Sequence, residues 1–366
     1  MHGQLIAVSL LALFLRGGVL SLLVNTWDWP GAVAILFAIG ATFAITQPGY
    51  AFVLSSSCKW RVGSGTRWQA MAIGLVVYAF VLRLVYLGQV ELLPEETYYW
   101  NYSRHLDTGY LDHPPMVACL IRVGTAAFGT SQFGVRVGAI FCAAATSFFM
   151  YRLTRNLFDK SSALVALVLA QVLPFFFMAG MLMTPDTPLT AAWAAELYFL
   201  ERALVAGRSG AWLGAGLFLG IGLVSKYSIG LLVPSALLFI LLDPQSRRWL
   251  RRWEPYAAAL IALAIFSPVI VWNAQNEWAS FVFQADRRLT GGPRFALHKL
   301  LLAVLVLITP TGLLAAAIVL LRRQKEADDE HASAERRRRW RFLQAAVGAP
   351  LAVFVAVSLR HNVKFD

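Results

Sequence analysis

The sequence predicts an all-α integral membrane protein, a polytopic helix bundle with about eleven transmembrane helices and interfacial helices in its first large outer loop. Hydrophobic residues make up 58% of the 366 residues and charged residues only 14%, whereas a soluble domain usually carries about 25% charged residues. The mean hydropathy is +0.61. Apolar windows of about 17–22 residues with almost no charge recur along the chain, and this length crosses a bilayer core.

These windows follow one another from the N-terminus. We expect spans at residues 5–24, 31–54, 71–87, 133–150, 163–178, 188–204, 211–224, 229–242, 257–272, 300–321 and 343–359. The N-terminal segment has no basic region and no small-residue cleavage site before Trp27, so we interpret it as a retained span rather than a signal peptide. Glycines inside the span 211–224 predict close helix packing rather than a phosphate-binding loop, because no strand precedes them; they are Gly214, Gly216, Gly220 and Gly222.

The basic residues set the predicted orientation. If the N-terminus is cytoplasmic, 20 of the 32 Lys and Arg residues fall in inner loops, as the positive-inside rule requires. The net charge of +12 does not indicate nucleic-acid binding, because no basic stripe is interleaved with aromatic residues on one soluble face. The cysteines are too few and too scattered for a disulfide framework or a zinc site; they are Cys58, Cys119 and Cys142.

The first outer loop, between Val90 and Phe133, contains two acids at the start of a predicted helix. Pro94 favours the first helical position, and Glu95 and Glu96 follow it in the first turn, where the helix dipole favours negative charge. Four aromatic residues come next at the spacing of a helix that lies in the membrane interface. An interfacial helix capped by two acids explains this pattern as well as a catalytic site does.

Further polar residues fall on the same predicted side of the membrane. Adjacent prolines hold Asp112 and His113 in an extended entry to the next helix. This pair could bind a divalent metal or a phosphate, although two ligands do not complete a metal site, and a simple turn accounts for them equally well. The others are Asp186 in Thr-Pro-Asp-Thr-Pro, Lys226 in a short break between two spans, and Arg360 near the C-terminus.

Together these residues fit the transfer of a sugar from a lipid phosphate. A carboxylate can accept the proton of an acceptor hydroxyl as it attacks the anomeric carbon. Cations or a metal can stabilise the charge that builds on the departing phosphate. Because a neutralised phosphate leaves readily, no covalent intermediate is needed, and inversion at the anomeric carbon is the simpler route.

The same residues resemble the lipid-dependent glycosyltransferases of the C fold, which include the protein mannosyltransferases and the aminoarabinose transferases of lipid A. The resemblance covers roughly residues 70–366. It rests on seven ordered motifs: Pro-Glu-Glu-Thr-Tyr-Tyr-Trp, Tyr-Leu-Asp-His-Pro-Pro, Phe-Gly-Val-Arg-Val-Gly around Arg136, Thr-Pro-Asp-Thr-Pro-Leu, Ser-Lys-Tyr, Trp-Asn-Ala-Gln-Asn-Glu-Trp-Ala-Ser-Phe and Ser-Leu-Arg-His-Asn-Val-Lys.

The resemblance implies a multi-pass protein of the bacterial inner membrane whose active site faces the periplasm or exterior. Its partners would be a polyprenyl-phosphate-linked sugar and a lipid, glycan or protein acceptor. The family usually has Asp-Glu at the acid pair, so Glu95 is our first choice for the base and Glu96 the second. Candidates for binding the donor phosphate or a metal are Asp112, His113, Asp186, Lys226 and Arg360. No cofactor is certain, and a divalent metal is an open option.

Two departures from the family pattern shape the predicted domains. Residues 1–62 form an additional pair of membrane helices, faintly similar to the small membrane proteins that assist the flipping of polyprenyl-phosphate sugars. Residues 63–366 form the glycosyltransferase domain, which we expect to be truncated at its C-terminus, because relatives usually continue with further chain.

Two other classes of function stay open from the sequence. A multi-pass transporter of a solute or lipid-linked sugar would account for charges in or near the spans at Arg83, Glu196 and Lys226. No matching interrupted helices in two halves support it, and the polar residues gather on one face rather than at the midplane. A non-catalytic remnant is the third reading. The sugar, the acceptor, a metal requirement and the oligomeric state are not readable from the sequence.

Overall fold

The computed structural model describes residues 2–54, 64–289, 295–321 and 330–360, and within these ranges its elements are all helices, joined by turns and loops, with no strand. The all-α prediction is therefore confirmed. In the part of the chain that the structure describes, seven helices are long and apolar enough to cross a membrane, and four shorter apolar helices accompany them. Every predicted span overlaps a helix, but the count of eleven membrane crossings is not confirmed by length and composition alone.

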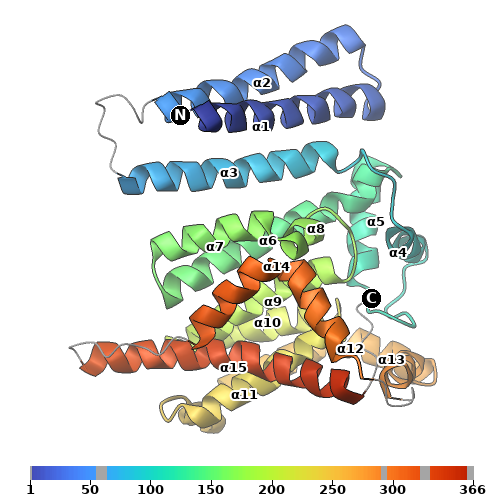
Figure 1. Ribbon diagram of the computed structural model, residues 1–366. Coiled ribbons are helices and arrows are strands. Elements are labelled where there is room, and N and C mark those ends of the chain that lie inside the picture. The colour runs from blue at the N-terminus through green and yellow to red at the C-terminus, as the bar shows by residue number, and fades with distance from the viewer. Residues whose placement is uncertain (1, 55–63, 290–294, 322–329, 361–366) are drawn as a thin grey trace.

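The first three helices form one flank of the molecule. They are α1 (His2–Ser21), α2 (Gly31–Leu54) and α3 (Ser64–Tyr86). In Figure 1, α1 and α2 pair as a hairpin that lies along α3. Tyr78 and Tyr86 on α3 donate hydrogen bonds of 3.0 and 2.9 Å to main-chain carbonyls of α1. Gly18 has no side chain at this contact, where a Cβ would lie 2.4 Å from Val85.

The central bundle is built from helices of unequal length. It contains α6 (Gln132–Leu157), α7 (Lys160–Val172), the short α8 (Pro174–Ala179), α9 (Asp186–Leu200), α10 (Ala211–Leu223), α11 (Leu232–Leu242) and α12 (Glu254–Gln275). The sequence predicted one span over 163–178, but Pro174 ends α7 and begins α8, because proline cannot supply the amide that would continue the helix. Ser131 caps α6 by accepting a 3.1 Å hydrogen bond from Gly134.

The glycines of α10 allow close helix packing in this bundle. A Cβ on Gly216 would lie 2.4 Å from the carbonyl oxygen of Ala258 on α12, and one on Gly220 would lie 2.8 Å from Ile265. The backbones of α10 and α12 therefore touch along this stripe. The predicted close packing of these glycines is confirmed.

The last two helices complete the fold, α14 (Leu297–Leu321) and α15 (Glu330–Arg360). Thr309 breaks α14 with a left-handed φ of 65°, and Pro310 follows it. At the predicted inner end, Arg338 of α15 bonds the carboxylate of Asp243 at 2.9 Å and the carbonyls of Leu204 and Val205. These carbonyls end the helical run of α9, so one side chain anchors the last helix.

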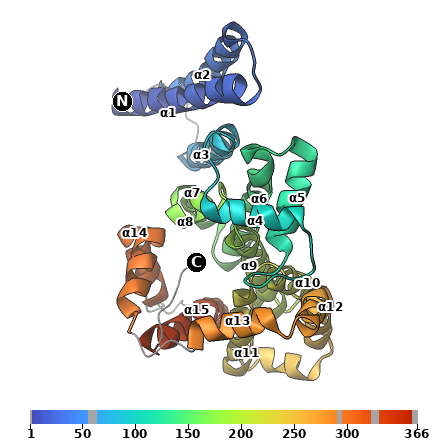
Figure 2. The ribbon, with the colours of Figure 1, turned by 90° about the vertical axis from the view of Figure 1, so that its right-hand side faces the viewer.

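Three helices at one end of the bundle position the candidate site. They are α4 (Pro94–Arg104), α5 (Met116–Phe128) and α13 (Ala279–Leu289). Figure 2 shows α4 and α13 crossing the face turned toward the viewer, transverse to the long helices. Helix α4 is the predicted interfacial helix, and α5 is the helix that was expected to follow Pro115, although no bounds were predicted for it. It is too short for a span, yet it buries Val117, Ala118 and Ile121 against the bundle.

Candidate functional site

The two acids of α4 have opposite environments. Pro94 occupies the first helical position, and Glu95 and Glu96 follow in the first turn, as predicted. The side chain of Glu95 is exposed, whereas Glu96 is fully buried at 0% exposure. Neighbouring residues in a helix point about 100° apart, so one acid faces the water and the other faces the core.

Glu96 is held by four hydrogen bonds. Arg136 of α6 donates to both of its oxygens, from Nε at 2.8 Å and from Nη2 at 2.6 Å. The main-chain amides of Met183 and Leu93 donate at 3.0 and 3.1 Å. Arg136 also binds the carbonyls of residues 87, 90 and 91. The pair ties α4, α6 and the segment before α9 together, so its position is that of a structural ion pair.

Tyr99 marks where the other acids converge. This phenol, one turn after Glu95, is only 7% exposed. Burial raises its pKa first, and the negative charges of Asp112, Tyr98, Glu95 and Asp186 raise it further. Three carboxylates from three segments therefore act on one hydroxyl. Glu95, Asp112 and Asp186 therefore lie near enough to Tyr99 to influence its proton.

Asp112 is oriented by a tyrosine of α4. The hydroxyl of Tyr102 donates to Asp112 Oδ1 at 2.8 Å, and Tyr98 lies within hydrogen-bond distance of that same hydroxyl. Tyr110 stacks on Tyr102 with 4.0 Å between ring centroids. Burial raises the pKa of Tyr102, and its bonds to Tyr98 and Asp112 raise it further. The carboxylate thus has a fixed donor that stays protonated at physiological pH.

The loop that carries Asp112 contacts side chains of α12 and α13. Trp272 at the end of α12 donates a 2.8 Å hydrogen bond to Asp107. Gly109 packs against the same indole, where a Cβ would come within 2.6 Å of the ring. Gln284 of α13 donates to the main-chain carbonyl of Asp112. Side chains from α12 and α13 therefore set the position of this loop.

A lysine and an aspartate form the cationic part of the site. Lys226 Nζ lies 2.9 Å from both carboxylate oxygens of Asp186, the first residue of α9. Lys226 is 16% exposed and Asp186 is 40% exposed, so the pair is open to solvent on one side. The amide of Met116 donates to the carbonyl of Val224 at 3.0 Å. This bond places the Asp112 segment beside the Lys226 segment.

The remaining candidates are placed differently. His113 is 7% exposed, with its ring 5.9 Å from that of Tyr99, so it belongs to the same cluster. Arg360 ends α15, but its side chain lies outside the described residues. Across the described ranges, no group of three His, Cys, Asp or Glu side chains could hold a metal ion.

Several functional contacts were missed from the sequence. The Arg136 motif was noted, but its pairing with Glu96 was not, although an arginine inside an apolar span signals a buried partner. The roles of Tyr99, Tyr102 and Gln284 were also missed. Their only signal was the density of aromatic and polar residues in the outer loops.

Comparisons with known proteins agree with this architecture. Residues 112–272 match the family described as dolichyl-phosphate-mannose-protein mannosyltransferase. A crystal structure of ArnT from Cupriavidus metallidurans in the apo state aligns with a TM-score of 0.55 and 17% sequence identity. This alignment covers 79% of the present chain and 60% of ArnT, and it shows a shared fold.

Curated relatives are enzymes of sugar transfer by name. The lipopolysaccharide core galacturonosyltransferase RgtA of Rhizobium johnstonii is 32% identical over 215 residues, which are 56% of this chain and 42% of RgtA. The undecaprenyl phosphate-alpha-4-amino-4-deoxy-L-arabinose arabinosyl transferase of Photorhabdus laumondii is 24% identical over 57% of this chain and 42% of its own. The chain spans less than half of the length of these relatives. The resemblance to C-fold lipid-dependent glycosyltransferases is confirmed.

Proposed function

We propose that the chain is a membrane glycosyltransferase that moves a sugar from a polyprenyl-phosphate carrier to an acceptor hydroxyl, with inversion, at the outer face of the membrane. The observation that carries this proposal is the ion pair of Lys226 with Asp186, which lies beside the segment of Asp112 that Tyr102 orients. Carboxylates and a cation within one cluster supply both the base and the phosphate partner that the reaction needs.

Glu95 is the proposed general base. Glu95 is exposed in the first turn of α4. Both carboxylate oxygens of Glu96, in contrast, are already bound by donors of the protein. As the acceptor oxygen bonds to the anomeric carbon, its proton passes to Glu95. The bond from this carbon to the phosphate oxygen breaks, and its electron pair leaves with the carrier phosphate.

Lys226 and His113 are the proposed partners of that phosphate. In the structure, the charge of Lys226 is balanced by Asp186. An arriving phosphate would share the ammonium with Asp186 and would gain a charge-assisted hydrogen bond. Asp112, held by Tyr102, is the proposed group that orients the donor head group or contributes a ligand to a metal. Arg360 stays a phosphate candidate, because its side chain lies outside the described residues.

The names of the relatives favour a particular range of substrates. Galacturonate and 4-amino-4-deoxy-L-arabinose are the sugars in those names, and lipopolysaccharide or undecaprenyl phosphate appears beside them. We propose a uronosyl or aminopentosyl donor and a lipopolysaccharide acceptor for this chain. We further propose that residues 63–366 form the transferase domain and that residues 1–62 are an addition to it.

Analysis of envelope lipids tests the proposal. Cells with and without the chain are compared by mass spectrometry of lipid A and core oligosaccharide. A uronic acid or aminopentose that depends on the wild-type chain, and is lost with Glu95→Gln, supports it. An unchanged glycan profile together with chain-dependent uptake of a solute would support the transporter instead.

A further inference from the structure

Arg83 is a fully buried cation without an acidic partner among the described residues. It lies in the last turn of α3, with 1% of its surface exposed. The other buried arginine among the described residues differs, because Arg136 pairs with Glu96; the partly buried Arg338 pairs with Asp243. An unpaired charge in an apolar interior is costly, and proteins normally neutralise such a charge with a counter-ion.

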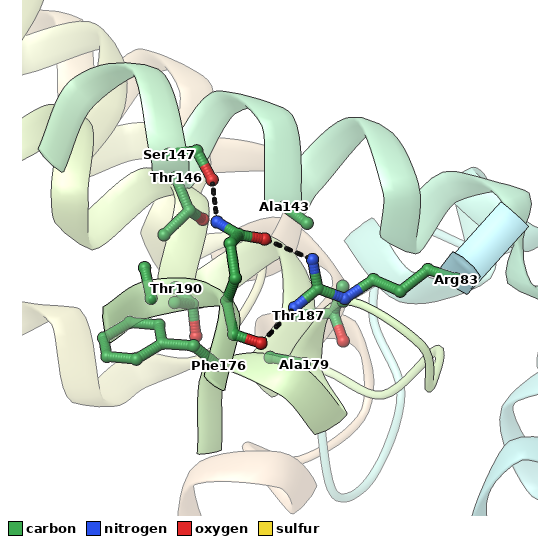
Figure 3. Close-up of a pocket in the computed structure, with 11 residues that line it drawn as sticks. Arg83, Ala143, Thr146, Ser147, Phe176, Ala179, Thr187 and Thr190 are labelled. Atoms are coloured by element: carbon green, nitrogen blue, oxygen red, sulfur yellow. Dashed lines mark hydrogen bonds between the residues drawn. The ribbon is translucent and has the colours of Figure 1, made fainter. Parts of the chain in front are cut away.

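The contacts of Arg83 leave one of its three nitrogens without a hydrogen-bond partner among the described residues. Both terminal nitrogens point at Gln171 of α7, one toward its side-chain oxygen and one toward its main-chain carbonyl at 3.4 Å (Figure 3). The rings of Phe80 and Phe177 lie 5.5 and 5.0 Å from the guanidinium carbon. The remaining nitrogen, Nε, is buried and has no hydrogen-bond partner among the described residues. Neutral oxygens and rings therefore surround a full positive charge.

A small cavity lies beside Arg83. Arg83 and Gln171 line it together with hydroxyl-bearing and small residues, among them Thr146, Ser147, Thr187 and Thr190. The three threonine hydroxyls donate to main-chain carbonyls, so their hydrogens are not available to a ligand. The free space is on the order of one water molecule. The cavity is thus too small for a sugar and large enough for a single atom.

Gly180 keeps the space beside Nε open. A Cβ at this position would lie 2.9 Å from Arg83 Nε and 3.2 Å from Ala143. Gly180 follows α8, and the chain then continues through Met183, which bonds Glu96, to Asp186. The cavity therefore borders the segment that leads to Asp186, one of the carboxylates of the candidate site.

We propose that Arg83 forms a binding site for a single anionic atom, either a halide ion or one terminal oxygen of a lipid phosphate. Such an atom would accept the hydrogen bond of Nε and neutralise the guanidinium. No cavity-lining residue competes as a counter-charge, since all except Arg83 are uncharged. The proposal depends on the geometry around Arg83 and not on the proposed transfer reaction.

Thermal unfolding of the purified full-length chain in an uncharged detergent tests the site. Chloride replaces gluconate, which is too large for the cavity, at constant ionic strength. For a halide site, the wild-type Tm rises saturably by about a few degrees at saturating chloride, because binding to the folded state stabilises it. The rise is absent in Arg83→Gln and reduced in Gly180→Ala. Arg251→Gln, which removes one exposed positive charge elsewhere, keeps the full rise.

A second titration identifies the source of the anion. Polyprenyl phosphate is added in the gluconate buffer without halide. A rise in Tm that requires Arg83 here, with no response to chloride, assigns the anionic atom to the lipid phosphate. If Arg83→Gln does not fold, the comparison of wild type with Gly180→Ala decides in the same way. Equal responses of wild type and the cavity variants to both probes would overturn the proposal.

Discussion

At the scale of single residues, two adjacent glutamates have separate tasks. Glu95 faces water beside a cluster of charges, and Glu96 is enclosed by Arg136 and two main-chain amides. The sequence offered both as bases, because both stand in the first turn of one helix. The two glutamates are distinguished by Arg136 on α6, which lies 40 residues later and pairs with Glu96.

Replacing Glu95 should affect turnover without affecting folding. Glu95→Gln removes the proposed base from an exposed position, and general-base catalysis contributes about 10²–10⁴-fold. We expect a loss of that size in transfer of sugar to the acceptor, measured with purified chain and lipid-linked donor. Thermal unfolding serves as the control and should match wild type. Full activity in Glu95→Gln would rule out this residue as the base.

Replacing Glu96 should affect folding first. Glu96→Gln leaves the buried guanidinium of Arg136 uncompensated, and breaking one side of a buried pair costs about 3–5 kcal/mol. We expect a large fall in the stability to denaturant and a lower yield of folded chain. The double variant Glu96→Gln with Arg136→Met should recover part of the loss, since it removes the uncompensated charge. Wild-type stability in the single variant would contradict this role.

Alkaline pH should weaken the outer loop. The pKa of Tyr102 is raised above its ordinary value of 10.0, so the folded protein holds a proton that the unfolded chain releases. Its contribution to stability is present below pH 10 and falls as the pH rises above it. We expect Tm to fall above about pH 10, and to fall less steeply in Tyr102→Phe. A control, Tyr256→Phe at the opposite end, should keep the wild-type dependence.

At the scale of helices, hydropathy predicted where the helices lie better than where they begin and end. The spans over α2, α10 and α12 were found within a few residues, because an apolar run must match the bilayer. The break between α7 and α8 was missed, although Pro174 is visible in the sequence. Helix α5 was expected after Pro115 but its bounds were not predicted, because a 13-residue amphipathic helix has neither the length nor the uniform apolarity of a span.

The contact between α10 and α12 makes a sharp prediction at this scale. Gly216→Ala places a methyl group 2.4 Å from the backbone of Ala258, and backbone cannot move aside cheaply. Such overpacking costs about 1–3 kcal/mol. We expect a lower Tm for the purified chain. Gly210→Ala, at a glycine with no atom within 4 Å of an added Cβ, is the matched control and should leave Tm nearly unchanged.

At the scale of the whole molecule, the candidate site gathers residues that are far apart in the sequence. Lys226 meets Asp186 across 40 residues, and Gln284 reaches Asp112 across 172. The hydropathy pattern predicts on which side of the membrane such residues lie, but it does not predict which of them contact each other. The side could thus be predicted from the sequence, whereas the ion pairs and the tyrosine that orients Asp112 required the structure.

The orientation of the whole chain can be tested by labelling. Leu106 in the first outer loop and Trp253 at the predicted inner end are 51% and 68% exposed. In a chain without its native cysteines, Leu106→Cys should react with an impermeant thiol reagent in intact cells. Trp253→Cys should react only after the membrane is opened. The opposite pattern would place the candidate site in the cytosol, away from the proposed donor.

Arg136 has a consequence for sequence variation. It holds the chain before α4 through main-chain oxygens, and the side chains of Val90 and Glu91 at two of these positions are exposed. Substitutions there should be neutral in orthologues and in saturation libraries, because the carbonyls do not depend on the side chain. Adding or deleting one residue between α3 and α4 would shift every carbonyl out of register. This stretch should therefore vary freely in composition and hardly at all in length.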